Sequence, residues 1–161
     1  LHYPLRRQRQ MCIRDSLGPQ RMTRYENWPT LLLHFVDSLD NQKFNWGKND
    51  CFIFCGGAIQ AMTGDDIFKG YKFKGKYDSA AGAIKQFKKH KFKTLESVWS
   101  HFLTPVAVAF AQRGDVVLKE LENEKMPACG IVLDQRSVFL APEGLTYLPT
   151  LESRLAFQVG S

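Results

Sequence analysis

Cys51 stands where a loop is expected to turn into a helix, which is a position that can activate a thiol. Asp50 precedes it and is a good N-cap residue, because its carboxylate can accept hydrogen bonds from the free amides of the first helical turn. Apolar residues then recur every three or four positions up to Gly64, at Phe52, Cys55, Ile59 and Met62. The positive end of the helix dipole favours a thiolate, so Cys51 is a candidate nucleophile. The alternative is that Cys51 is a small buried hydrophobic residue.

The segment around Cys51 resembles the nucleophile segment of NlpC-type cysteine peptidases, a papain-like family of cell-wall hydrolases. Phe52 and Ile53 stand where that family has Ser-Gly, and the residues that match are Phe44, Trp46, Gly47, Asp50 and Cys51. The layout from roughly Met22 onward is also similar to a family of small proteins of unknown function, often encoded by phages and prophages. The resemblance implies a papain-like α+β fold, in which a Cys-bearing helix packs on a C-terminal antiparallel sheet or half-barrel.

The resemblance also implies a general base and a residue that orients it, and this sequence has neither. Gly114-Asp115 matches the Gly-Asp element of the NlpC family, and Gly130-Ile131 matches its Gly-Ile strand. The histidine position then falls on Ala128, and the orienting position falls on Leu140. A thiol nucleophile needs a base within hydrogen-bonding reach. We therefore expect incomplete peptidase machinery, and we expect Ala128→His to bring an imidazole toward the Cys51 sulfur.

Helical and strand patterns are segregated along the chain, which predicts an α+β fold. Besides the Cys51 helix, we expect helices from Asn27 to about Asp40, after Ser79 and after Thr94. From residue 115 onward, short apolar runs alternate with turn residues and predict a curling antiparallel meander, with strands at 115–118, 129–133, 138–141, 145–148 and 155–159. The histidines of residues 22–161 are His34, His90 and His101, and all three precede the predicted sheet.

Residues 1–21 are interpreted as a leader outside the fold, which leaves one domain over residues 22–161. The leader contains five arginines and one aspartate, shows no periodicity, and resembles translated sequencing-adapter read-through. The alternative is a genuine disordered basic arm. The whole chain of 161 residues carries a net charge of +6, but residues 22–161 hold 17 basic and 15 acidic residues, or +2. The overall charge is therefore poor evidence for nucleic-acid binding.

Charge is concentrated between Lys69 and Lys93, where nine lysines accompany one acidic residue, Asp78. A solvated helix face accounts for such a run. The alternative is a docking surface for nucleic acid or an acidic partner, for which the candidate binding residues are Lys85, Lys88, Lys89, Lys91 and Lys93.

We expect no cofactor and no metal. Cys51 and Cys55 are four residues apart and do not form the Cys-x-x-Cys pattern of zinc sites, and Cys129 is remote in sequence. A disulfide within one helix is not expected, and reduced thiols fit a cytoplasmic setting. No apolar run approaches the roughly 18 residues of a membrane helix, and no signal peptide is evident. We expect a protein that is cytoplasmic in a bacterial host or associated with a virion, without a membrane partner.

These observations favour a non-catalytic NlpC-like domain. The resemblance implies a phage or prophage origin and an association with phage tail proteins. One alternative is an active cysteine hydrolase, either a peptidoglycan peptidase or an acyltransferase, that uses Cys51 with an unidentified base. The other is a basic module that binds a partner or nucleic acid through Lys69–Lys93.

Overall fold

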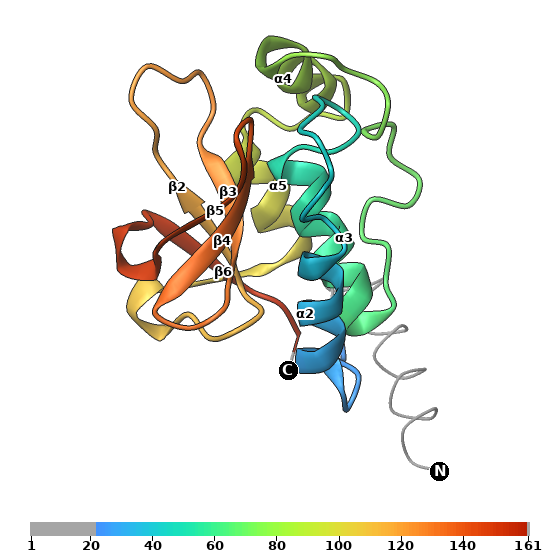
Figure 1. Ribbon diagram of the computed structural model, residues 1–161. Coiled ribbons are helices and arrows are strands. Elements are labelled where there is room, and N and C mark those ends of the chain that lie inside the picture. Colours follow the sequence, from blue (N-terminus) through green and yellow to red (C-terminus); the bar gives the residue numbers. More distant parts are fainter. Residues whose placement is uncertain (1–21, 161) are drawn as a thin grey trace.

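Helices precede strands in the chain, as the sequence patterns predict, and the α+β class is confirmed for residues 22–160, which the computed structural model describes. The helices of this part are α2 (Trp28–Asp37), α3 (Cys51–Thr63), α4 (Ala80–Lys89) and α5 (Leu95–Phe102). Figure 1 shows α2, α3 and α5 beside the sheet, with α4 at one end of the molecule.

Local capping explains where three of these helices begin. The side chains of Asp50, Ser79 and Thr94 each accept a hydrogen bond from the backbone amide three residues later. Gly64 ends α3 in a left-handed conformation with φ of 81°, as its sequence position predicts. Asn27 precedes α2, but its side chain makes no capping hydrogen bond, and α2 ends at Asp37 rather than near Asp40.

The strands form a six-stranded antiparallel sheet in the order β1-β6-β2-β3-β4-β5 within the described residues. Strands β2 to β6 lie at the five predicted strand positions, but only β2 to β5 form a meander, because β6 pairs with β2 and not with β5. Strand β1 forms an edge that the sequence patterns did not predict. The bounds are β1 (Thr104–Val106), β2 (Val116–Lys119), β3 (Ala128–Val132), β4 (Arg136–Ala141), β5 (Gly144–Pro149) and β6 (Leu155–Gln158). The short helices η1 (Val108–Phe110) and η2 (Thr150–Glu152) lie in the connections.

Both faces of the sheet are buried along β2, β3 and β4, because successive side chains of a strand point to opposite faces and successive residues of these strands are buried. Val116 and Leu118 belong to the large core between sheet and helices, whereas Val117 belongs to a smaller cluster on the other face. The large core also holds Trp99 and Phe52, which are fully buried. Each large apolar side chain buried in this way contributes about 1.5–3 kcal/mol, so helix–sheet packing is the main source of stability.

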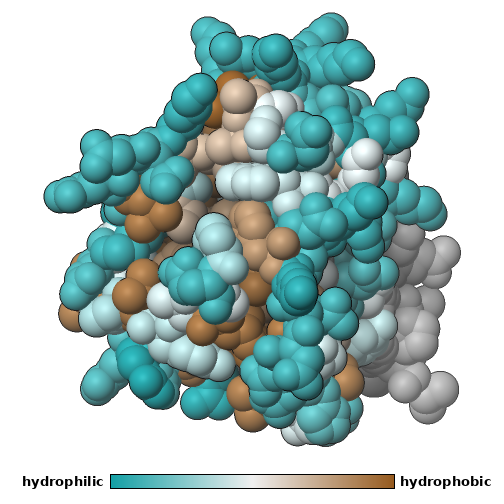
Figure 2. Space-filling view, turned by 45° about the horizontal axis from the view of Figure 1, so that its top comes forward, coloured by the Kyte–Doolittle hydropathy of each residue, from teal (hydrophilic) through white to brown (hydrophobic). Residues whose placement is uncertain are grey.

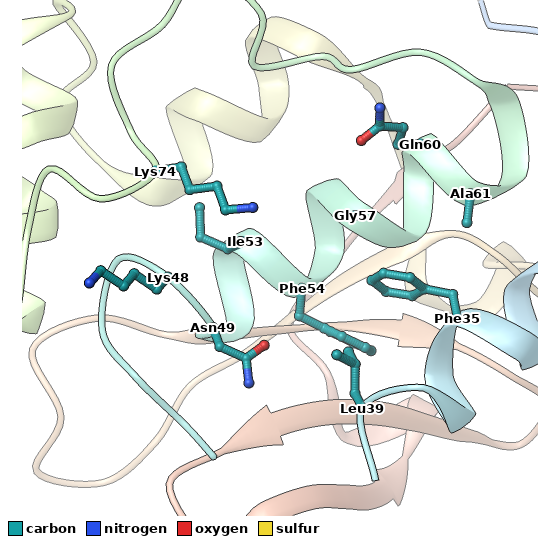
Figure 3. A pocket seen from close by; sticks show the side chains of 10 residues that line it. All are labelled: Phe35, Leu39, Lys48, Asn49, Ile53, Phe54, Gly57, Gln60, Ala61 and Lys74. Atoms are coloured by element: carbon teal, nitrogen blue, oxygen red, sulfur yellow. The ribbon is translucent and has the colours of Figure 1, made fainter. Parts of the chain in front are cut away.

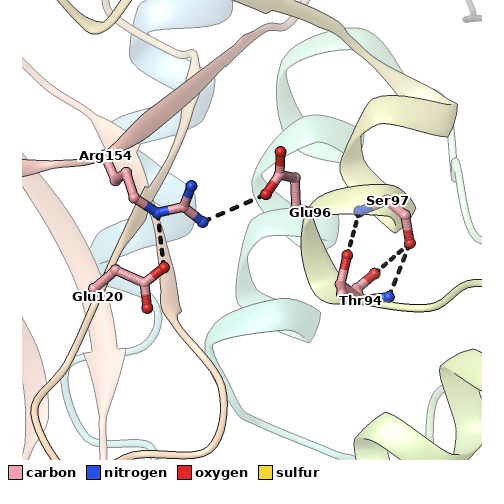
Figure 4. A network of polar contacts seen from close by, with 5 residues as sticks. All are labelled: Thr94, Glu96, Ser97, Glu120 and Arg154. Carbon is pink, nitrogen blue, oxygen red and sulfur yellow. Dashed lines mark hydrogen bonds and ion pairs between the residues drawn. The ribbon is translucent and has the colours of Figure 1, made fainter.

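Exposed ion pairs link Glu96 of α5 to Arg154, the residue before β6, and Arg154 to Glu120, the residue after β2. Thr94 and Ser97 form a capping box at the start of α5, and Figure 4 shows Glu96 of the same turn beside Arg154. The Arg154 guanidinium lies 2.7 Å from a Glu120 oxygen and 3.4 Å from a Glu96 oxygen. Such exposed pairs contribute at most about 1 kcal/mol each, so they add little to the stability that helix–sheet packing provides.

The surface combines charged and apolar areas. Figure 2 shows a face with hydrophilic side chains around its margin and apolar residues within its hollowed middle. Large hydrophobic side chains are exposed at several positions of the described chain, among them Leu33, Phe110, Leu121, Tyr147 and Leu151. No helix in residues 22–160 combines the length and apolar character needed to cross a membrane.

Candidate functional site

The loop before α3 is held in place by Asp50 and Gly47. Asp50 is 1% exposed, and its carboxylate accepts hydrogen bonds from the backbone amides of Ile53 (2.9 Å) and Gly47 (2.8 Å) and from the hydroxyl of Tyr77 (2.6 Å). Gly47 has φ of 81°, and a Cβ there would lie 2.1 Å from the carbonyl oxygen of Tyr77. Both carboxylate oxygens of Asp50 are therefore engaged in fixing the start of α3, and neither is free to act as a base.

Three thiols meet where α3 packs on β3. Cys51 is 7% exposed, Cys55 and Cys129 are completely buried, and all three are free cysteines. Cys129 influences the pKa of both Cys51 and Cys55, so the three side chains lie close enough to interact. We call these three residues the thiol cluster. The arrangement places small polarisable side chains, with no imidazole among them, at the position where the family resemblance implies a catalytic centre.

The environment of the thiol cluster keeps its members protonated. The interaction with Cys129 and burial raise the pKa of the Cys51 thiol well above its ordinary value. Burial raises the pKa of Cys55 and that of Cys129 as well. The nearby Asp50 carboxylate raises all three pKa values further, because a negative charge opposes a thiolate. At neutral pH the cluster is a group of thiols and a weak nucleophile.

The residue of β3 that faces Cys51 is Cys129, and not Ala128 as the sequence resemblance implies. Cys129 lies in the large core with Cys51, whereas Ala128 packs against the cluster on the opposite face of the sheet. An imidazole at position 128 would therefore point away from the Cys51 sulfur, and the expectation for Ala128→His is wrong. Leu140 of β4 does lie on the same face as Cys129 and is buried. The residue that faces Cys51 from the sheet is a cysteine.

Two of the three described histidines have hydrogen-bonding partners outside the thiol cluster. His90 accepts a hydrogen bond from the backbone amide of Lys72 (3.1 Å), and the His101 imidazole lies 3.3 Å from the hydroxyl of Tyr71. His34 is exposed on α2. No hydrogen bond joins any of these three imidazoles to the thiol cluster, so none serves as a base for Cys51 in this conformation.

Asp115, the aspartate of the Gly-Asp element, belongs to a structural clasp. Its carboxylate accepts hydrogen bonds from the Arg24 guanidinium (3.0 Å) and from the amides of Gln112 (2.9 Å) and Val159 (3.1 Å). Arg24 also donates to the carbonyls of Val159 and Arg113, at 2.7 Å each. Burial raises the pKa of the Asp115 carboxyl, although these donors and the Arg24 charge favour its ionised form. This Arg24 clasp joins the start of the described chain to β2 and to its end.

The other motif positions are also structural. Gly114 has φ of 92° and precedes the clasp. A Cβ at Gly130 would lie 2.6 Å from the ring of Phe139 on β4, so a glycine allows that ring to pack across the strand. Trp46 is half-buried and packs edge-on against Phe44, with ring centroids 5.0 Å apart. These residues shape the loop and the sheet and do not contact a reacting group.

The candidate binding lysines are exposed on α4 and the turn after it. Lys85, Lys88, Lys89, Lys91 and Lys93 are all exposed, and within the described residues none of them forms an ion pair. The opposite side of α4 is buried through Ala83 and Phe87. The arrangement is the solvated helix face that the charge pattern predicts, and it is separate from the thiol cluster.

Sequence reasoning missed Cys129 and Tyr77 as neighbours of the Cys51 turn. The alternation of strand residues was a usable signal for Cys129, because a strand that turns Ile131 toward the helices turns Cys129 the same way. Tyr77 carried no such signal, since its hydroxyl reaches Asp50 from a loop 27 residues away. Among residues 22–160, no group of three or more His, Cys, Asp or Glu side chains is arranged to hold a metal ion.

Comparison of the sequence with protein-family models gives one family for this chain. The model described as "Domain of unknown function (DUF6950)" matches residues 23–159. The chain belongs to this family. The DUF6950 match covers the Arg24 clasp, the thiol cluster and every helix and strand described above. A search of curated proteins gave no match.

Proposed function

We propose that this DUF6950 domain is a non-catalytic NlpC-like domain that acts by binding other proteins, in a phage or prophage setting such as tail assembly. The observation that carries the proposal is the neighbourhood of the Cys51 thiol, which is buried against the thiol of Cys129. A cysteine hydrolase needs a thiolate and a general base, and the described residues around Cys51 supply neither. The packing of a Cys-bearing helix on an antiparallel sheet supports the NlpC-like assignment, and the phage setting is implied by the sequence resemblance alone.

The rival function is an active hydrolase or acyltransferase that uses Cys51. It would require a thiolate at neutral pH, which the interaction with Cys129, burial and the Asp50 charge all oppose. It would also require a base other than the described histidines, since His90 and His101 are hydrogen-bonded elsewhere and His34 is exposed on α2. The geometry therefore favours the non-catalytic alternative.

The rate of iodoacetamide modification of each cysteine against pH tests the proposal. Mass spectrometry distinguishes Cys51 from Cys55 and Cys129 in the unaltered protein, and the same protein unfolded in urea supplies the reference for ordinary thiols. We expect modification of folded Cys51 to be slow at neutral pH and to rise only above about 8.5, the ordinary thiol pKa. We also expect no cleavage of peptidoglycan peptides. Fast modification of Cys51 below about pH 7, with peptide cleavage that Cys51→Ser abolishes, would replace this proposal with the hydrolase.

A further inference from the structure

A groove follows the face of α3 that is turned away from the thiol cluster. Ile53, Gly57 and Gln60 repeat at intervals of four and three residues and lie roughly opposite Cys51 and Cys55 on a helix of 3.6 residues per turn. They form part of two adjoining hollows, of about 420 Å³ and about 390 Å³, which share these three residues and Lys74. We call this combined depression the α3 groove.

Two glycines of α3 allow aromatic rings to pack directly against the helix at the groove. A Cβ at Gly57 would lie 2.6 Å from the ring of Phe35, and a Cβ at Gly56 would lie 2.4 Å from the ring of Phe68. Phe35 and Phe68 line the first and second hollow respectively. A glycine inside a helix costs about 0.5–1 kcal/mol relative to alanine, and here two of them allow aromatic rings to approach the helix from both sides. The Phe35 and Phe68 rings therefore form an apolar floor that lies directly against α3.

Unpaired positive charges border the apolar floor. Lys48 and Lys74 line the first hollow, Lys69 and Lys74 line the second, and all three are exposed. None of the three forms an ion pair with another described residue. Figure 3 shows Lys48 and Lys74 on one side of α3 and Phe35 and Leu39 on the other. The groove thus combines apolar contact area with lysines that form no ion pair among the described residues.

We infer that the α3 groove binds an acidic peptide segment of a partner protein, with large apolar side chains in the hollows and carboxylates at Lys48 and Lys74. The inference rests on the proposed binding function and describes the partner by its chemistry. Successive side chains of a bound peptide can occupy successive pockets, which suits two adjoining hollows. Carboxylates beside the lysines would supply the charge complementarity that fixes orientation and speeds association.

A nucleic acid fits the groove less well than an acidic peptide. A phosphate backbone requires a row of cations along its path, and Asp66 interrupts such a row in the second hollow. The carboxylates of the proposed peptide lie instead at Lys48 and Lys74, which line the first hollow. The Phe35 ring is stacked against Phe54 at a centroid distance of 5.8 Å, and the Phe68 ring is stacked against Phe52 at 4.4 Å. These rings are committed to the core and do not offer free faces for base stacking.

Affinity selection from a random peptide library, of about 12 residues per peptide as a groove-length probe, tests the inference on the full chain. Enriched peptides are then measured by fluorescence anisotropy against the unaltered protein and against Lys48→Glu/Lys74→Glu. The matched control is Lys85→Glu/Lys89→Glu on α4, which changes the net charge equally but lies outside the groove lining. A single-stranded DNA probe of about 20 nucleotides is measured in parallel.

We expect enriched peptides that carry Asp or Glu beside a large apolar residue. Their binding should weaken by about tenfold or more in the groove variant and by less than about twofold in the control. Failure to enrich any peptide, enrichment of neutral or basic peptides, or equal loss in both variants would overturn the inference, as would DNA binding that only the groove variant loses. This result does not depend on the alkylation of Cys51. If a protein with a reactive Cys51 binds acidic peptides, the non-catalytic proposal is rejected, but the inference that the α3 groove binds an acidic peptide is supported.

Discussion

At the level of single residues, the neighbours of Cys51 outweigh its position at a helix N-terminus. The helix dipole stabilises a nearby anion by about 0.3–1 kcal/mol, which is less than one pKa unit. Burial shifts the pKa of an ionisable side chain by up to several units, and Cys51 is 7% exposed. The interaction with Cys129 and the Asp50 charge act in the same direction as burial. A nucleophile-like sequence position is therefore compatible with an inert thiol.

A histidine facing Cys51 should restore part of the missing chemistry. We expect Cys129→His to bring an imidazole beside the Cys51 sulfur and to speed iodoacetamide modification of Cys51 near neutral pH, because an imidazole can take the thiol proton. The larger side chain in the core should cost about 1–3 kcal/mol of unfolding free energy, which denaturant unfolding measures. Ala128→His is the matched control on the other face of the sheet and should leave the Cys51 rate unchanged. Equal acceleration in both variants would contradict the assigned register.

The thiol cluster should also make stability fall at alkaline pH. All three thiols have a folded-state pKa above the ordinary value, so the unfolded chain releases their protons first. Stability is fully present below about pH 8.5 and is lost as pH rises, by at most about 1.4 kcal/mol per pH unit for each thiol. Burial and Asp50 raise the pKa of Tyr77 in the same direction, which adds to the loss above about pH 10. Urea unfolding at a series of pH values measures the slope.

The control for this slope is the variant Cys51→Ala/Cys55→Ala/Cys129→Ala. Removal of the thiols should lower stability overall because it leaves cavities, but the decline between about pH 8.5 and pH 10 should become flatter. An unchanged slope in the triple variant would mean that other groups cause the alkaline loss.

At the level of helices and strands, the sequence predicted the features that depend on nearby residues. The bounds of α3 follow from Asp50 and Gly64, which act within one helical turn. The strands of the β2–β5 meander follow from period-two alternation and turn residues. Pro105 correctly predicts that the preceding helix ends before it, but the sequence did not indicate that Pro105 also belongs to strand β1, where it pairs with Phe157 of β6. Edge pairing of this kind depends on residues far apart in the chain, which local patterns do not encode.

The Arg24 clasp could likewise not be predicted from the sequence. Substitution of Arg24 should lower the free energy of unfolding strongly. The Arg24 and Asp115 side chains are 10% and 4% exposed. We expect Arg24→Met to cost about 3–5 kcal/mol, because it leaves the Asp115 carboxylate buried without its cation. Arg154→Met is the matched control, since its ion pairs are exposed and should cost less than about 1 kcal/mol. Denaturant unfolding of both variants checks the difference, and similar losses would show that the clasp is dispensable.

At the level of the whole molecule, the two ends of the described chain close the domain together. Met22 is 1% exposed, and a Cβ at Gly160 would lie 2.5 Å from the carbonyl oxygen of Met22. Arg24 bonds to Val159 in the same region, and the family match covers residues 23–159. Among the described residues, the contacts that complete the core therefore begin at Met22.

Deletion of residues 1–21, which lie outside the described residues, should leave the thermal stability nearly unchanged. The sequence pattern indicates that they are a leader, and a chain that starts at Met22 keeps both the buried Met22 side chain and the Arg24 clasp.

Deletion as far as Arg24 is the matched control, because it removes both the Met22 side chain and the Arg24 clasp. A loss of 1 kcal/mol lowers the melting temperature by roughly 2–8 °C in domains up to this size. We therefore expect calorimetry to show a shift below about 2 °C for the first truncation and a much larger fall for the second. A fall of several degrees on removal of residues 1–21 alone would mean that the leader contributes to the folded domain, and the boundary at Met22 would be wrong.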